Sequence, residues 1–176
     1  MKGMTNVFGE LDIKDRWNLK IIKVESNEVK NYTPIGMAYV MMRNASFEGK
    51  DISLSYKYGC VNTRDSFVVE CEENSSACII DFPGLSLLET RLFIQDCLDM
   101  GNLSYMDGGT NTTAINPGRL GDPVVNYVHF PAHMYQTLHT HPSHRVGLVI
   151  RGNGKIELDN KEFYDINEGE IFFMRR

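Results

Sequence analysis

The chain has 176 residues, of which 42% are hydrophobic and 23% charged, with a formal net charge of −5 and a pI near 5.5. This composition is typical of a globular protein that buries a core without disulfides or structural metals. The net negative charge does not favour nonspecific binding to nucleic acid, which requires a positively charged surface. No apolar run reaches the length of a membrane span, and the N-terminus lacks the apolar segment of a signal peptide. We therefore expect a cytoplasmic protein without nucleic-acid or membrane partners.

The four cysteines do not form a C-x-x-C motif that would indicate a metal or redox site. They are Cys60, Cys71, Cys78 and Cys97. Reduced, mostly buried thiols are the expected state.

Short runs rich in β-branched and aromatic residues dominate the first half of the chain, and turn-forming residues separate them. The runs cover residues 19–26, 37–44, 52–59, 65–72 and 77–84. Close, regular spacing of this kind predicts an antiparallel sandwich or barrel. This half contains no histidine, so a pocket within it would have no imidazole ligand.

Residues 85–100 separate the two halves, and their leucines fit helical spacing loosely before Gly101. The interpretation is a short linking helix. Residues 105–123 are rich in Gly, Asn, Thr and Pro, which indicates a long loop or the flank of a pocket. Within them, residues 107–111 are either an anion-binding nest of backbone N–H groups or a plain turn.

The most informative stretch is HMYQTLHTHPSHRVGLVIRGNG, residues 133–154, which holds four of the five histidines. Its polar and imidazole side chains recur at every second position, which in a strand would place them on one face. The members of this alternation are His133, Tyr135, Thr137, His139 and His141. A turn at 142–143 and a second, buried strand over 146–150 are predicted to follow.

Beyond Gly154, Asp159-Asn160 between two alternating runs predicts a two-residue hairpin, and Glu168-Gly169 predicts another turn. The apolar run 171–173 then lies close to the end of the sequence. We expect either a fragment of a longer protein or a last strand that a partner completes by edge pairing.

The residues from His133 to Phe173 resemble the cupin family. The family's first motif is a glycine, five residues, H-x-H, three or four residues, a glutamate, six residues and a glycine. His139-Thr140-His141 supplies H-x-H, and Gly152 stands at the final glycine. The hairpin and the turn at Gly169 resemble the approach to the family's second motif.

The sequence departs from the cupin pattern at three places. His133 occupies the position of the leading glycine, and Arg145, with His144 beside it, occupies that of the metal-binding glutamate. The sequence also ends before the histidine of the second motif. Two ligands, His139 and His141, therefore carry over, and His144 is the candidate for a third. A two-ligand site needs water, substrate or another segment to complete it.

The resemblance implies an all-β fold: a cupin-type double-stranded β-helix, or jelly-roll barrel, preceded by a second β-sandwich that is a degenerate cupin. The expected domains are residues 1–100 and residues 101–176. The resemblance also implies a homodimer.

Three functions fit these residues. The first is a metal-dependent enzyme of the oxygenase or isomerase type, with Fe, Mn, Ni or Zn on His139 and His141. Tyr135 and His144 would be its catalytic groups, and Tyr135 and Thr137 would hydrogen-bond the substrate or a metal-bound water. His144 could instead be an exposed turn residue. The alternative for the histidine pair is a structural or solvated role.

The second is a binding module without catalysis, in which Arg145 pairs with an anionic small molecule and His133 and Thr137 help to bind it. Arg145 could instead be a turn cation, and Thr137 could simply pack within a barrel. The third is a structural cupin that has lost its site, because one fold supports all three classes.

Overall fold

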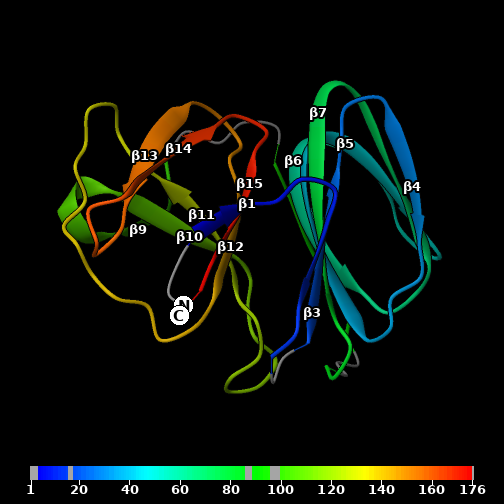
Figure 1. Ribbon diagram of the computed structural model, residues 1–176. Coiled ribbons are helices and arrows are strands. Elements are labelled where there is room, and N and C mark those ends of the chain that lie inside the picture. The colour runs from blue at the N-terminus through cyan, green and yellow to red at the C-terminus, as the bar shows by residue number, and fades with distance from the viewer. Residues whose placement is uncertain (1–3, 16–17, 86–88, 96–99, 176) are drawn as a thin grey trace.

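The computed structural model describes residues 4–15, 18–85, 89–95 and 100–175, and strands dominate them. They form two lobes (Figure 1). One lobe holds β2 (Glu10–Ile13), β3 (Leu19–Val24), β4 (Glu28–Tyr32), β5 (Met37–Gly49), β6 (Ser53–Thr63), β7 (Phe67–Phe82) and β8 (Arg91–Gln95). The other holds β1 (Met4–Asn6), β9 (Leu103–Ser104), the 3₁₀ turn η1 (Met106–Gly108), β10 (Thr110–Ile115), β11 (Val125–His129), β12 (Arg145–Leu148), β13 (Asn153–Glu157), β14 (Phe163–Asn167) and β15 (Ile171–Met174). The all-β prediction is confirmed.

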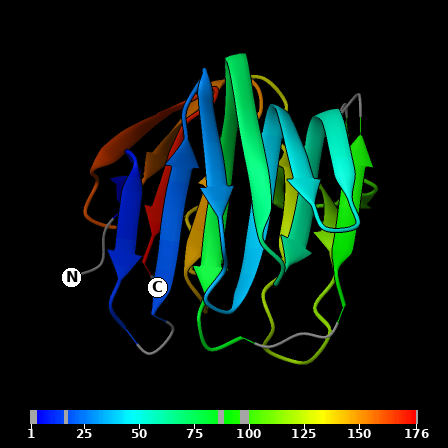
Figure 2. The same ribbon diagram turned by 90° about the vertical axis from the view of Figure 1, so that its right-hand side faces the viewer.

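The first lobe is one large antiparallel sheet in the order β2-β3-β7-β5-β6-β8, with β4 added alongside β7 (Figure 2). β7 pairs with β4 through residues 67–71 and with β3 through residues 77–81. Between these stretches the β5–β7 register shifts, and Asn44 and Asn74 have positive φ values of 52° and 58°. Asparagine tolerates this left-handed conformation, and such bulges bend strands.

A first hydrophobic core lies within this lobe, on one face of β3, β5, β6 and β7. It includes Val24, Val40, Phe47, Val61, Val69 and Ile79, all almost fully buried. Period-two alternation explains it, because every second side chain of these strands lies on this face.

The second lobe consists of a β1-β15-β12 sheet, a β11-β10-β9 sheet and the β13-β14 hairpin. β15 lies between β1 and β12, so it has a neighbour on both edges. The expectation that a partner completes this strand is therefore wrong: residues from the start of the sequence already do so. Homodimer formation and a domain boundary near residue 100 stay predictions.

A second core joins the lobes. It combines the other face of the large sheet with the inner face of the β1-β15-β12 sheet. Its buried members include Ile21, Tyr39, Cys78, Ile80, Ile115, Ile171 and Phe173. This apolar contact fixes β12 and β15 against the first lobe.

The helix predicted over residues 85–100 is wrong where the structure describes that segment, because residues 91–95 form β8 on the edge of β6. Asn62 is fully buried, and its Oδ1 accepts the Arg91 N–H at 2.6 Å. Phe93 packs against the interlobe core, while Leu92 and Ile94 remain exposed. A two-residue repeat supported by an open sheet edge outweighs loose helical spacing. Residues 86–88 and 96–99 lie outside the described residues.

The hairpin between β13 and β14 is confirmed, but its loop differs from the prediction. The Leu158 N–H donates to Glu162 O at 2.9 Å, and the Lys161 N–H donates to Leu158 O at 2.9 Å. These bonds close a three-residue loop in which Lys161, with φ at 63°, takes the left-handed position that glycine usually fills. The turn at Gly169, whose φ is 80°, is as predicted.

Cys60, Cys71 and Cys78 are buried free thiols, as expected, and Cys97 lies outside the described residues. Burial raises the pKa of the Cys60 and Cys71 thiols to about 12, which makes both unreactive at neutral pH. Within the part of the chain that the structure describes, no helix is both long and apolar enough to cross a membrane.

Candidate functional site: an imidazole pair with an arginine

The histidine-rich stretch is an irregular segment between β11 and β12, so the predicted strand over residues 133–141 is wrong. Proline at 131 and 142 removes two backbone donors, and no strand of the described chain pairs with the segment. His133 adopts a φ of 62° in a turn that the Met134 N–H closes on Pro131 O at 3.2 Å. The five alternating side chains therefore do not share a sheet face.

Two hydrogen bonds hold this segment in place. The Thr137 N–H donates to Asp107 Oδ2 of η1 at 2.7 Å, and the Tyr135 hydroxyl donates to Glu157 Oε2 of β13 at 3.2 Å. The Thr137 N–H is the main cause that lowers the pKa of Asp107, so this carboxylate remains an acceptor at neutral pH. Asp107 and Glu157 were not predicted as site residues. An acid before two glycines is the signal that could have suggested Asp107.

Despite the missing strand, the imidazoles of His139 and His141 lie together, with ring centroids 4.7 Å apart and planes at 82°. His139 Nδ1 lies 2.8 Å from Thr137 O, which can only accept, so Nδ1 carries the proton and Nε2 is free to accept. His141 Nδ1 lies 3.1 Å from an Arg145 guanidinium nitrogen, which can only donate, so the proton of neutral His141 sits on Nε2. The pair thus presents one ring acceptor and one ring donor.

Arg145 begins β12 and is the third member of this group. It pairs with Met174, as Gly147 pairs with Phe172, whereas Val146 and Leu148 alternate toward the interlobe core. Arg145 therefore projects from the opposite face of the sheet. Its guanidinium also donates to Ser143 Oγ at 3.0 Å, and the side chain is exposed.

The electrostatics of the group favour a neutral His141 ring. Partial burial lowers the pKa of His141, and the neighbouring Arg145 guanidinium and the His139 ring lower it further. His141 is therefore uncharged at pH 7, and the permanent cation of the group is Arg145.

The donor set does not fit a resident divalent metal. Among the described residues, no three His, Cys, Asp or Glu side chains form a group that could hold one. A guanidinium stands on His141 instead of a carboxylate, and it would repel a dication. His141 would also have to exchange its proton and lose the Arg145 bond to coordinate through Nε2.

The remaining predicted residues have other partners. His144 Nε2 lies 2.6 Å from Asp15 Oδ2, and its ring meets that of Phe173 edge-on at 5.4 Å between centroids. His144 thus joins the β12 strand to the chain before β3. Tyr135 contacts Glu157, and His133 is an exposed turn residue. The structure brings together His139, His141 and Arg145 of the predicted set, with Thr137 as backbone support.

Residues 120–176, which include this site, match the family model of AraC-like ligand binding domains. No curated protein sequence matches the chain significantly. Among solved structures, a DUF861-family protein of unknown function from Pseudomonas syringae pv. tomato aligns with a TM-score of 0.56 at 11% identity, covering 97% of this chain and 77% of that one. An IolB-like protein from Salmonella typhimurium aligns with a TM-score of 0.49 at 13% identity, covering 89% and 74%.

The chain therefore has a cupin-like fold, and its C-terminal segment is similar to a ligand-binding domain. The match covers β11–β15 and the whole imidazole–arginine group.

Proposed function

We propose that the protein is a small-molecule-binding module whose ligand is an organic anion held by Arg145 beside His139 and His141. The observation that carries the proposal is the guanidinium of Arg145 on His141 Nδ1, at the position of the family's metal-binding glutamate. The similarity of residues 120–176 to AraC-like ligand binding domains supports a ligand-binding role.

The hydrogen-bonding capacity of the group favours a hydroxy acid. Arg145 has five N–H donors, and its bonds to Ser143 and His141 leave enough of them for a carboxylate. His141 Nε2–H is a further donor, whereas His139 Nε2 can accept from a ligand hydroxyl. A carboxylate with a neighbouring hydroxyl therefore matches the donors and the acceptor together.

Titration calorimetry with L-malate and succinate tests this proposal, since the two acids differ by one hydroxyl. We expect both to bind, malate more tightly, and Arg145→Gln to weaken each by about tenfold or more, which corresponds to about 1.4 kcal/mol. His139→Ala should remove the preference for malate. Arg151→Gln, the same change on another exposed arginine, is the control. Equal binding by the wild type and Arg145→Gln refutes the anion site.

A metal-dependent oxygenase or isomerase is the second candidate, because imidazoles 4.7 Å apart are close enough to share an ion once Arg145 moves away. Bound Fe, Mn, Ni or Zn would act as a Lewis acid on a small substrate. Tyr135 and His144 stay predictions as catalytic groups. Elemental analysis of untagged protein decides: near-stoichiometric metal that His139→Ala/His141→Ala removes favours the enzyme.

The variant Arg145→Glu separates the two candidates further, because it supplies the carboxylate of the cupin pattern. If the arginine is what excludes the metal, Ni²⁺ should bind this variant and not the wild type. Neither anion nor metal binding by the wild type would instead favour a structural cupin.

A further inference from the structure

The interface between the lobes changes from apolar to polar along β7. Ile80 and Cys78 lie in the interlobe core, and two residues earlier the same face presents Ser76. Arg43 is directly opposite Ser76 on β5, and Lys23 is opposite Cys78 on β3. Above the core, therefore, the contact with the second lobe is built from polar side chains.

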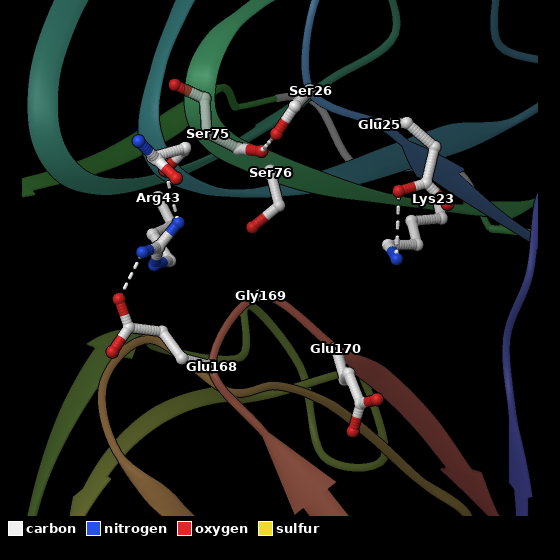
Figure 3. Close-up of a pocket in the computed structure, with 10 residues that line it drawn as sticks. Lys23, Glu25, Ser26, Arg43, Ser75, Ser76, Glu168, Gly169 and Glu170 are labelled. Atoms are coloured by element: carbon white, nitrogen blue, oxygen red, sulfur yellow. Dashed lines mark hydrogen bonds and ion pairs between the residues drawn. The ribbon is translucent and has the colours of Figure 1, made fainter.

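At this point a pocket of about 380 Å³ opens between the large sheet and the β14–β15 turn (Figure 3). Its volume lies within the range of small-molecule sites. The lining side chains are all polar or charged: Lys23, Glu25, Ser26, Arg43, Asn74, Ser75, Ser76, Glu168 and Glu170, with Gly169 between the last two. A ligand for this pocket should be mainly hydrophilic, because none of the described residues that line it has an aromatic or aliphatic side chain.

Ser76 is the feature that points to a ligand. The residue is 3% exposed, and its buried Oγ has no hydrogen-bond partner among the residues that the structure describes. Its side chain projects from the sheet into the gap above Gly169 (Figure 3). A Cβ on Gly169 would lie 3.5 Å from Ser76 Oγ, in ordinary van der Waals contact, so a side chain there would cover the hydroxyl that glycine leaves uncovered. Buried hydroxyls are almost always paired, and one that is not calls for a partner from outside the chain.

The charges of the pocket indicate what that partner carries. Lys23 pairs with Glu25 at 2.9 Å, and Arg43 pairs with Glu168. Among the described residues, Glu170 forms no ion pair, and its Oε2 accepts only from Asn167, at 2.7 Å from the backbone N–H and 3.2 Å from Nδ2. One negative charge is thus left without a cation, in a site that also offers a free hydroxyl.

We propose that this interlobe pocket binds a small amino alcohol, whose hydroxyls bond to Ser76 and whose protonated amine pairs with Glu170. A carboxylate near an ammonium in a partly desolvated pocket gains more than it would in open solvent. The site is separate from the Arg145 group and does not depend on the function proposed there.

Two pairs of probes test the proposal by NMR titration of the full chain in phosphate buffer. Serinol differs from glycerol, and D-glucosamine from D-glucose, by an amine in place of one hydroxyl. We expect serinol or D-glucosamine to bind saturably and its neutral counterpart to bind at least about tenfold more weakly. Equal binding of amine and neutral molecule refutes the role of Glu170, and binding by none of the four overturns the site.

Variants locate the binding. Ser76→Ala removes a hydroxyl without protein partners and so leaves the fold intact, and Glu170→Gln removes the unpaired charge. Each should weaken amine binding about tenfold. Glu70→Gln, the same charge change on an exposed residue of β7, and Arg145→Gln should leave it unchanged. Amine binding that survives both pocket variants would show that it occurs elsewhere.

Discussion

Replacing Arg43 with methionine should loosen the contact between the lobes. Only 11% of the Arg43 side chain is exposed, and its Nε donates at 2.9 Å to Ile150 O, two residues beyond the end of β12. The guanidinium also donates to Asn74 O and to the carboxylate of Glu168. Methionine keeps an apolar stem of similar length while removing every donor.

The expected loss of stability follows from these partners. A hydrogen bond contributes about 1 kcal/mol, and one to a charged group about 1.5–3 kcal/mol, when the partners are removed from water. Glu168 is 44% exposed on its side chain and regains water when Arg43 is absent, so the ion pair contributes only about 0.5–1 kcal/mol. The sum is about 2–3 kcal/mol, which for a chain of this length lowers Tm by roughly 5–10 °C.

Thermal and urea unfolding of Arg43→Met, Glu168→Gln and the double variant measure the effect. The cycle should give a coupling of about 0.5–1 kcal/mol for the ion pair. Arg64→Met, at an exposed arginine in the turn between β6 and β7, is the matched control. If Arg43→Met lowers Tm no more than Arg64→Met does, the hydrogen bonds of Arg43 to the second lobe do not stabilise the fold.

Lowering the pH should reduce the difference in Tm between the wild type and Arg43→Met. The bond from Arg43, and then that from the Gly152 N–H, lowers the pKa of Glu168 from its ordinary 4.5. A carboxylate whose folded pKa is depressed stabilises the fold above its unfolded pKa and loses that contribution as pH falls through the folded value. The gap in Tm should thus be full at pH 7 and smaller well below pH 4.5.

Three further outcomes are expected. Asp81→Ala should lower the free energy of unfolding in urea by about 3–5 kcal/mol. Asp81 is a fully buried acceptor for the Tyr32 hydroxyl and for the N–H groups of residues 35 and 36, and a loss below about 1 kcal/mol would contradict its role. Lys161→Gly should raise stability by about 1 kcal/mol, since glycine adopts the left-handed conformation without strain, and an unchanged Tm would argue against strain there. The pKa of His141, measured by NMR, should lie below 6.5 and should rise in Arg145→Gln. Because folded His141 binds fewer protons than the unfolded chain does, its contribution to stability is lost as pH falls below 6.5. A titration midpoint at 6.5 or above would contradict the contact with Arg145.

The strands of the large sheet could be predicted because their signal is local. Residues 19–26 are rich in β-branched residues, and residues 19–24 of this run form β3, whose faces contact both cores. The glycine turn before β15 was visible for the same reason, because a left-handed residue between two apolar runs needs no distant partner to be recognised.

The errors arose where a distant partner decides the structure. The period-two pattern of residues 133–141 is genuine, but a strand needs a neighbour, and nothing local shows that none pairs there. Conversely, residues 91–95 form a strand because they pair with the edge of β6. β1 pairs with β15, and Arg43 with Glu168, across most of the chain. Such contacts leave no periodic trace.

His139 and His141 lie close together although the predicted strand does not form, because hydrogen bonds position them. The Thr137 carbonyl accepts from His139 Nδ1, and the Thr137 N–H donates to Asp107. Arg145 then fixes His141 from the start of β12. A glutamate at that position would attract a dication, whereas an arginine repels it. Two unit charges about 4 Å apart near a protein surface attract or repel each other by about 4 kcal/mol. The loop that would hold a metal in the cupin pattern therefore carries a permanent cation beside its imidazoles, which is the feature that the proposed anion site requires.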